Sequence, residues 1–394
     1  MYRLGESLTP RYKVLDFMGE GTFARVLECW DRKEKRHVAI KVVRAVEKYT
    51  ESAAIEKQII LKVMEAADRL LDRKEFTHCI QLIDDFMFRG HFCLVYPKCG
   101  RSLYDFLRRN RYRGFSSECL FHLSRQLVEA IAFLHNIDLI HTDLKPENIL
   151  FTTDEYIEDD SVNPTSQRRT RCLEHAEAAV SKGTFAMQAL KKERSSRPYR
   201  YPASTDIKVI DFGSAIFQHE HHSKIISTRH YRAPEVIFDL GWDFPADIWS
   251  VGCILVELYT GDALFQTHEN MEHLALMERS LGPFPADMLS QAQRKSAGKY
   301  LRRDGTLCWP EMASSASSRE FVATAPSLED LLHEEPDFLD LVRGMLRYRP
   351  EERLTAQEAL FHPFFTSRKS LLPSSEEIGV AEALAPAADQ HPQL

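Results

Sequence analysis

The sequence lacks a long apolar run, an apolar leader and closely paired cysteines. The most apolar helix candidate among its 394 residues, "IWSVGCILVELYTG", contains Glu257 and is too short to cross a lipid bilayer. The opening "MYRLGESLTPRY" has no apolar core of the kind that a secretory signal needs. The 8 cysteines are dispersed without a CxxC pair, which is typical of buried thiols in a reducing compartment. We therefore expect a soluble intracellular protein without a membrane partner.

Positive charge is also in deficit. Lysine and arginine together number 51 against 58 aspartates and glutamates, so the formal net charge is -7. This balance argues against general nucleic-acid binding and suits a basic partner. With 44% hydrophobic residues, the chain can bury a sizeable core.

Strand patterns fill the first quarter of the chain and helix patterns most of the rest. Short segments rich in β-branched and aromatic residues occupy 12–43, 79–88 and 91–96. A helix pattern covers 46–66, and the periodic stretches after Gly100, such as "SECLFHLSRQLVEAIAFLHN", are helical as well. This order predicts an α+β fold in which a β-rich lobe precedes a mainly helical lobe.

Two segments carry no steady period. Residues 152–206 begin acidic ("DEYIEDD") and end basic ("KKERSSRPYRYP"), and we interpret them as an insert in the domain. The tail, 366–394, is rich in proline, alanine and glutamate and is expected to be disordered. The folded domain is therefore placed at about 11–365, with the first lobe at about 11–98 and the second at about 99–365.

A glycine-containing stretch, "GEGTFARV" at residues 19–26, lies between two expected strands. Glycines let backbone N–H groups approach a phosphate closely, and a hairpin would make the loop a lid. An ordinary β-turn explains the same residues about equally well. Ala24 stands where a third glycine is usual in such loops, and it adds only a methyl group.

Lys41 ends the apolar strand "VAIK", and a carboxylate able to pair with it lies on the next helix. Glu56 shares one helix face with Ile59, Ile60 and Val63, so it lies in an apolar stripe. A carboxylate aimed at a core needs a cation, because breaking a buried pair costs on the order of 3–5 kcal/mol. Taken alone, Lys41 also fits a lysine that reaches from an edge strand to solvent.

Two further motifs carry oxygen ligands. In "HTDLKPENIL", residues 141–150, Asp143 and Asn148 are close enough for one loop to aim both at one site, with Lys145 between them. A carboxylate accepts a proton, and an amide oxygen helps to hold a hard cation such as Mg²⁺. In "DFG", Asp211 follows an apolar strand and can ligate a metal, although an Asp-Gly hairpin turn fits equally well.

In chain order these motifs resemble the signature set of the eukaryotic protein kinases: glycine-rich loop, VAIK, helix glutamate, catalytic loop, DFG and, at 233–235, APE. The likeness extends from about Arg11 to Phe365. "EHLALMER" differs only at Leu276 from the EHLAMMER signature of the LAMMER, or CDC-like, kinases. "STRHYRAPE" and "GWDFPADIWSVGCILVELYTGDALFQTHEN" are also similar to that family, above all to its plant and algal members. Leu274 and Met277 indicate, in addition, a packed helix that supports the second lobe without taking part in chemistry.

The resemblance implies a bilobal kinase fold and ATP-dependent phosphorylation of serine or threonine, with ATP and Mg²⁺ as cofactors. Asp143 would accept or orient the hydroxyl proton, and Lys145 would neutralise charge on the transferred group. Asn148 and Asp211 would hold Mg²⁺. The expected ATP-binding residues are Gly19, Glu20, Gly21, Thr22, Phe23, Ala24, Val26, Ala39, Lys41, Glu56, Tyr96 and Cys99.

The resemblance also assigns the hinge and the substrate side. Tyr96 would be the gatekeeper, and Cys99 would offer its backbone N–H to adenine while its thiol stays inert. Glu147, Glu257 and Thr228 would contact the substrate. The two glutamates occupy positions where kinases selective for basic peptides bind arginine, but many other kinases have glutamate there too.

The family implies arginine/serine-rich splicing factors as protein substrates, a nuclear location and autophosphorylation that extends to tyrosine. We expect a monomer without direct nucleic-acid contact. The alternative is a pseudokinase, a catalytically inactive scaffold. Its hallmark would be loss of Lys41, Asp143, Asn148 or Asp211, and all four are present.

Thr142 departs from the general kinase pattern. Most kinases of this type have an arginine there, which pairs with a phosphate on the activation loop. Because Thr142 is neutral, the loop "FQHEHHSKIISTRHYR" must be held by packing and local hydrogen bonds, including one from Thr228 to the catalytic loop around Asp143. We therefore expect activity without phosphorylation of this loop. Alternatively, Arg229 or Arg232 replaces the missing arginine as phosphate receptor.

Overall fold

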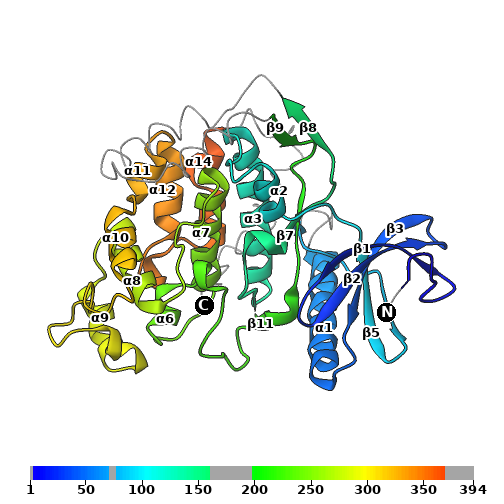
Figure 1. The fold of residues 1–394 in the computed structure, drawn as a ribbon, viewed down its shortest axis with the longest axis horizontal. Coiled ribbons are helices and arrows are strands. Elements are labelled where there is room, and N and C mark those ends of the chain that lie inside the picture. The colour runs from blue at the N-terminus through cyan, green and yellow to red at the C-terminus, as the bar shows by residue number, and fades with distance from the viewer. Residues whose placement is uncertain (1–2, 71–76, 160–197, 369–394) are drawn as a thin grey trace, which may run out of the picture.

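The computed structural model describes residues 3–70, 77–159 and 198–368. Figure 1 shows a β-rich first lobe and a helical second lobe, as expected from the sequence. Of the expected tail, 366–394, Thr366 ends a described helix and residues 369–394 lie outside the described residues, as do residues 160–197 of the expected insert. Within these residues, no helix is both long enough and apolar enough to cross a membrane.

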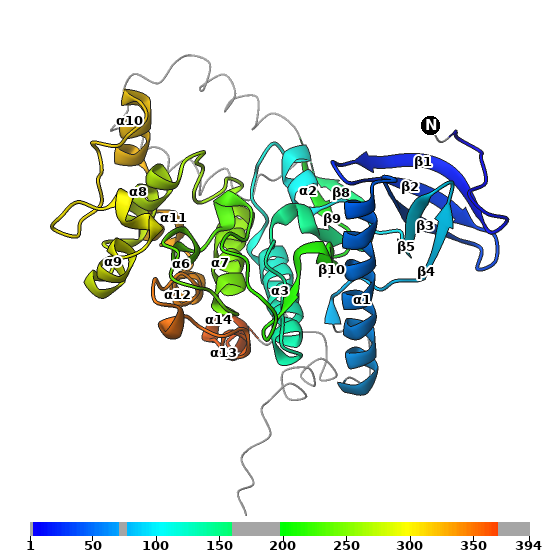
Figure 2. The same ribbon diagram turned by 90° about the horizontal axis from the view of Figure 1, so that it is seen from below.

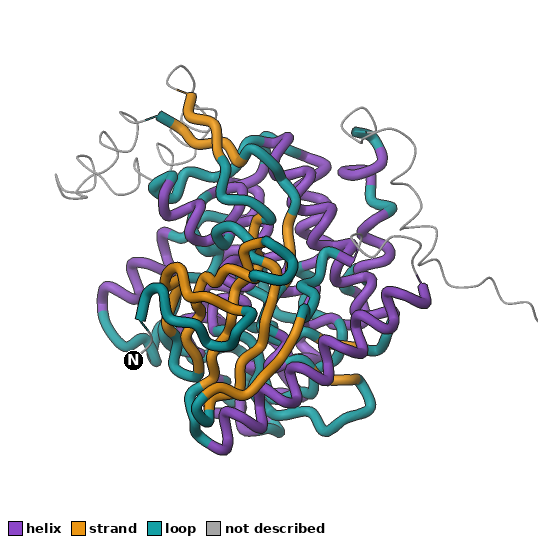
Figure 3. The backbone as a smooth tube through the Cα atoms, turned by 90° about the vertical axis from the view of Figure 1, so that its right-hand side faces the viewer, coloured by secondary structure: helices purple, strands orange, loops and turns teal. Residues whose placement is uncertain are grey.

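The first lobe is built on one antiparallel sheet with the strand order β1-β2-β3-β5-β4. Figure 3, which views the molecule from this side, shows the strands grouped in front of the helices. The strands are β1 (Tyr12–Glu20), β2 (Ala24–Asp31), β3 (Arg36–Val43), β4 (Asp84–Phe88) and β5 (His91–Pro97). The strand expected at 79–88 begins only at Asp84, because the backbones of Cys79 and Ile80 pair with Val209 of the second lobe instead.

Helix α1 (Glu47–Leu70) joins β3 to β4 and lies between the sheet and the second lobe (Figure 2). Its buried face includes Glu56, Ile59, Ile60 and Val63, as the sequence pattern predicted. The helix extends four residues beyond the expected end at Ala66. It therefore carries one carboxylate toward the sheet on an otherwise apolar face.

The second lobe is organised around α3 (Ser117–Asn136) and α7 (Pro245–Thr260), which pack against each other. Nearly all side chains of α7 are buried, and Trp249 has no exposed surface. The helix at "EHLALMER" is confirmed: α8 (Asn270–Leu281) buries Leu274 and Met277 completely. Within the described residues, the remaining α-helices are α2 (Leu103–Arg109), α6 (Pro234–Ile237), α9 (Ala286–Gln293), α10 (Ala316–Thr324), α11 (Leu328–Leu332), α12 (Pro336–Met345), α13 (Ala356–Leu360) and α14 (Pro363–Thr366).

The two ends of the expected insert are structured. Strands β8 (Tyr156–Asp159) and β9 (Tyr199–Pro202) form an antiparallel pair. Tyr199 is 1% exposed and its hydroxyl donates to the Gly114 carbonyl at 2.9 Å. The residues of β8, "YIED", do not alternate between apolar and polar, and for this reason the sequence pattern did not reveal the pair.

Two short strand pairs bring distant loops together. β6 (Leu139–Ile140) pairs with β11 (Ile216–Phe217), and β7 (Ile149–Phe151) pairs with β10 (Ile207–Val209). The loop between β6 and β7 therefore lies beside the loop between β10 and β11.

Candidate active site

The loop 141–148 and the DFG segment are joined by direct contacts. The imidazole Nε2 of His141 lies 3.1 Å from the Ile210 carbonyl, and its ring centroid lies 5.4 Å from that of Phe212. The Ile210 N–H donates to the Asn148 carbonyl at 2.9 Å. These contacts bring Asp211 to the side of the loop that carries Asp143 and Asn148.

The Asp143 carboxylate is held on both oxygens. Thr228 donates to Oδ1 from its backbone N at 3.0 Å and from its Oγ1 at 2.7 Å, and Lys145 Nζ donates to Oδ2 at 2.5 Å. Burial alone would raise the pKa of Asp143, but the hydrogen bonds from Lys145 and Thr228 outweigh it and lower the pKa below its usual value. The carboxylate is therefore ionised at neutral pH, and the expected hydrogen bond from Thr228 is confirmed.

Asn148 and Asp211 offer the donors that a hard divalent cation prefers. The amide Nδ2 of Asn148 donates to the Asp143 carbonyl at 2.9 Å, which leaves its oxygen as the atom for a cation. The Asp211 side chain is 45% exposed. Among the described residues there is no cluster of three or more His, Cys, Asp or Glu side chains suited to a metal. A carboxylate and an amide that share a cation with nucleotide phosphates are the usual Mg²⁺ arrangement, so these two residues fit that ion.

Lys41 and Glu56 form the predicted ion pair. Lys41 Nζ lies 2.8 Å from each Glu56 oxygen and 3.4 Å from Asp211 Oδ1, and Glu56 is 5% exposed. Burial alone would lower the pKa of Lys41, but the carboxylates of Glu56 and Asp211 raise it. The alternative of a lysine that reaches into solvent is therefore wrong.

Tyr96 adds a contact that the sequence did not reveal. Its hydroxyl donates to Glu56 Oε1 at 3.3 Å, and it lies opposite Ala39 on the neighbouring strand. Cys99, just beyond β5, is 7% exposed, and burial raises the pKa of its thiol to about 11. A thiol that stays protonated is a poor nucleophile, in line with the inert thiol expected there.

The glycine-rich loop is an open turn between β1 and β2. Nothing lies within 4 Å of the position that a Gly19 Cβ would occupy. Glu20 anchors the turn, because its Oε1 accepts from Arg25 at 2.8 Å and from Arg44 at 2.7 Å. Of the other loop residues, Gly21, Thr22 and Phe23 are exposed in the turn, whereas Ala24 and Val26 begin β2.

A groove of about 740 Å³ borders the catalytic loop on the side of α7 and α8. The acidic side chains that line it are Glu147, Glu257, Asp262, Glu269 and Glu272. Glu257 is 4% exposed and accepts a hydrogen bond of 2.7 Å from the Tyr231 hydroxyl. Burial raises the pKa of Glu257 to about 7. Of the two glutamates expected to bind substrate, Glu147 is thus exposed on the groove and Glu257 is nearly enclosed.

Asp247 is a site residue that sequence reasoning missed. It is 1% exposed on α7, and its carboxylate accepts from the backbone N–H groups of His141 at 2.8 Å and of Thr142 at 2.9 Å. Its Oδ2 also lies 3.2 Å from His135 Nε2. The available signal was an aspartate within the most apolar helix of the chain, where a buried charge needs partners.

Thr142 connects three segments. Its side-chain hydroxyl donates to the Ser214 carbonyl at 2.8 Å, directly after the DFG motif. Its own carbonyl accepts from Ser227 Oγ at 2.9 Å. Its backbone is left-handed, with φ of 70°, which is unfavourable for a β-branched residue. The local hydrogen bonds expected in place of an arginine–phosphate pair are therefore present.

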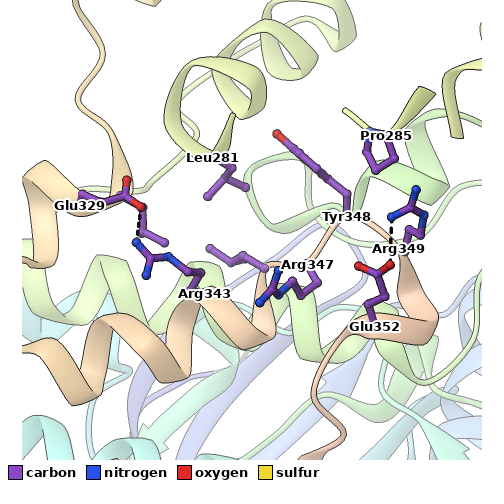
Figure 4. Close-up of a pocket in the computed structure, with 10 residues that line it drawn as sticks. Leu281, Pro285, Glu329, Arg343, Arg347, Tyr348, Arg349 and Glu352 are labelled. Carbon is purple, nitrogen blue, oxygen red and sulfur yellow. Dashed lines mark hydrogen bonds and ion pairs between the residues drawn. The ribbon is translucent and has the colours of Figure 1, made fainter. Parts of the chain in front are cut away.

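A second hollow lies elsewhere in the second lobe, where α12 ends (Figure 4). Leu281 and Tyr348 line it together with Arg347, and an ion pair of 2.9 Å joins Arg349 to Glu352 at one side. None of the expected site residues lines this hollow, so it is separate from the candidate active site.

Comparison with known proteins places the chain in a family. The protein kinase domain family matches residues 12–159 and 199–365. Serine/threonine-protein kinase AFC2 of Arabidopsis thaliana is 46% identical over 374 residues, which cover 94% of this chain and 80% of that protein. Dual specificity protein kinase CLK2 of Homo sapiens is 40% identical over 379 residues, which cover 95% and 68%. The chain belongs to the LAMMER protein kinases.

The fold of this LAMMER kinase agrees with that assignment. The crystal structure of another kinase domain, 36% identical, superposes with a TM-score of 0.79 and covers 93% of this chain and 98% of its own. As a protein kinase, the LAMMER kinase uses ATP and a divalent metal ion and phosphorylates proteins. Nothing in the comparisons supports the inactive scaffold.

Proposed function

We propose that this kinase transfers the γ-phosphoryl group of ATP, with Mg²⁺, to serine or threonine in arginine/serine-rich splicing factors. The acidic groove beside the catalytic loop carries the proposal, because five carboxylates line it and guanidinium groups pair well with carboxylates. The net charge of -7 attracts the same basic substrates over longer distances. A nuclear location and a monomeric state complete the proposal.

Each site residue has a role in the transfer. Asp143 orients the substrate hydroxyl and accepts its proton, since its carboxylate is ionised and held by Thr228. Lys41, fixed by Glu56, binds the α- and β-phosphates. The side-chain oxygens of Asn148 and Asp211 would hold Mg²⁺, which would neutralise charge on the phosphates. The hydroxyl oxygen attacks the γ-phosphorus, the bond to the β,γ-bridging oxygen breaks, and ADP leaves.

The roles of the glycine-rich loop, Cys99 and Lys145 are proposed from their positions in the protein kinase motifs. The glycine-rich loop covers the phosphates, and the Cys99 backbone N–H binds adenine. Lys145 neutralises charge on the transferred group. The human and mouse CLK2 relatives are named dual specificity kinases, which supports autophosphorylation on tyrosine here.

A peptide library tests the substrate class. Serine peptides with arginine on either side should be phosphorylated with much higher kcat/KM than matched peptides with glutamate or glycine there. Asp143→Asn and Lys41→Arg should each lower kcat/KM by several orders of magnitude, with an unchanged thermal unfolding midpoint. Equal rates on arginine and glutamate peptides would refute the substrate class, and full activity of either variant would refute the active-site assignment.

We also predict activity without phosphorylation of the activation segment, residues 217–232, because neutral Thr142 is hydrogen-bonded to Ser214 and Ser227. The test is co-expression with a phosphatase, followed by mass spectrometry of Ser223, Ser227 and Tyr231 and measurement of initial rates. Rates within a few-fold of the untreated enzyme are expected. A ~100-fold loss that rephosphorylation reverses would instead favour Arg229 or Arg232 as a phosphate receptor.

A further inference from the structure

Ser227 connects the activation segment to the catalytic loop. Its hydroxyl donates to the Thr142 carbonyl at 2.9 Å, and the residue is half-buried. Its backbone is left-handed, with φ of 64°, which few non-glycine residues adopt. A strained residue of this kind persists only where its contacts hold it, so this hydrogen bond matters for the path of the segment.

The next residue holds the proposed base. Thr228 donates to Asp143 Oδ1 from both its backbone N and its Oγ1. On the other side, the Thr142 backbone N–H is bound to buried Asp247. Asp247 thus holds the catalytic loop from the side of α7. Because Thr228 follows Ser227 directly in the chain, we expect a displacement of Ser227 to weaken the hydrogen bonds from Thr228 to Asp143.

We propose that Ser227 is an inhibitory phosphorylation site. A phosphoserine dianion has no proton to donate to the Thr142 carbonyl, and it brings acceptor oxygens and about two negative charges to the place of a donor. These charges repel the carbonyl and the nearby Asp143 carboxylate. The segment then leaves the catalytic loop, Thr228 releases Asp143, and phosphoryl transfer stops.

Three cations near Ser227 are already engaged. Lys145 donates to Asp143 Oδ2 at 2.5 Å and to Thr228 Oγ1 at 3.2 Å. Arg232 donates to the Ile226 carbonyl at 2.9 Å and to the Ser227 carbonyl at 2.7 Å. Arg229 donates to Asn270 at 2.5 Å. A guanidinium that turned to the new phosphate would give up bonds that shape or anchor the same segment, and neutral Thr142 offers no replacement.

The modification uses ATP and a serine kinase, a second copy of this chain included. Ser227 Oγ attacks the γ-phosphorus of ATP, the bond from that phosphorus to the β,γ-bridging oxygen breaks, and ADP leaves. The hydroxyl proton passes to the base of the phosphorylating kinase. The inference rests on the proposed kinase activity and adds a regulatory site to it.

The experiment installs phosphoserine at position 227 of the full chain by codon suppression. The matched control carries phosphoserine at 223, since Ser223 is exposed and its hydroxyl bonds only within its own segment, to the Ile225 carbonyl at 3.3 Å. Initial rates are measured on an arginine-flanked serine peptide, with the unmodified chain as reference. We expect kcat/KM to fall ~100-fold or more with phosphoserine at 227 and to stay within about threefold with phosphoserine at 223.

Reversal separates inhibition from misfolding. Phosphatase treatment, confirmed by mass spectrometry, should restore the rate of the protein phosphorylated at 227. Ser227→Ala loses the hydrogen bond without gaining charge, so its kcat/KM should fall less than about tenfold. A rate within about threefold of the reference despite phosphoserine at 227, or no recovery after its removal, overturns the inference. An inactive unmodified chain would overturn the proposed function itself, and the inference with it.

Discussion

Glu257 shows how burial changes the chemistry of a single residue. The side chain is 4% exposed, its pKa is raised to about 7 by burial, and the Tyr231 hydroxyl is its hydrogen-bond donor. It nevertheless lines the acidic groove, where its charge would serve a basic substrate. The ionised form of Glu257 would therefore bind a basic substrate better, but burial of its negative charge destabilises the folded protein.

A pH-dependent stability follows from that shift. Between the ordinary glutamate pKa of 4.5 and about 7, the unfolded chain loses this proton while the folded chain keeps it. The stabilisation that Glu257 contributes to the folded state is therefore fully present below pH ~4.5. As the pH rises through 7 this stabilisation is lost, which lowers the free energy of unfolding by up to ~3 kcal/mol. Glu257→Gln should lack this dependence. Urea unfolding of both proteins from pH 4.5 to 8 measures the difference, and parallel curves would show that the pKa is not shifted.

At the scale of elements, the β8–β9 pair fixes the ends of the insert to the second lobe. Besides Tyr199, Arg200 participates, because its backbone N–H and carbonyl bond the Asn110 side chain at 3.0 and 2.8 Å. The cross-strand partners Asp159 and Tyr199 lie at the end of the pair, so a short turn can join them directly. Only the part of the insert between β8 and β9 can therefore be removed without breaking contacts with the second lobe.

We predict that replacing residues 160–197 with Asn-Gly, which forms a three-residue turn together with Pro198, leaves turnover of a short peptide and the unfolding midpoint nearly unchanged. In contrast, Tyr199→Ala should lower the free energy of unfolding by about 3–5 kcal/mol, because it leaves a large cavity and an unpaired Gly114 carbonyl. Urea unfolding and peptide kinetics measure both. Loss of the unfolding transition after the deletion would show that 160–197 belong to the folded core.

At the scale of the whole molecule, one buried ion pair joins segments far apart in the chain. Arg353 lies 2.8 and 3.0 Å from the two oxygens of Glu235, the glutamate of the APE motif, and the two side chains are 0% and 1% exposed. Arg353 also donates to the Pro245 carbonyl at 2.6 Å, at the start of α7. The pair thus ties the end of the activation segment to α7 and to the last part of the domain.

Breaking this pair should be costly. Arg353→Met leaves Glu235 buried without a cation, and we expect a loss of about 3–5 kcal/mol in the free energy of unfolding. The matched control is Arg343→Met, which removes the exposed pair with Glu329 visible in Figure 4 and should cost at most about 1 kcal/mol. Urea unfolding compares the two variants. If both variants lost the same free energy of unfolding, burial of the Arg353–Glu235 pair would not increase its contribution to stability.

Much of the fold and of the candidate site could be predicted because it depends on local spacing. The apolar faces of α1 and α3 repeat with helical period, and the glycine-rich loop, Lys41, Asp143 and Asp211 each lie within a short motif. The Lys41–Glu56 pair was also predictable, because a carboxylate in an apolar stripe requires a cation. The β8–β9 pair was not, since the residues of β8 do not alternate between apolar and polar.

The sequence by itself determined which groups the protein has for chemistry and their order in the chain, since motifs are local. Only the tertiary structure decided how those groups are held. Asp247 accepts hydrogen bonds from Thr142 and His141, which lie 105 and 106 residues earlier in the chain. Thr228 donates to Asp143, which lies 85 residues earlier. The enclosure of Glu257 likewise depends on Tyr231, which lies on another segment. Hydrogen bonds and desolvation depend on distances in space, which chain packing sets and which spacing along the sequence does not encode.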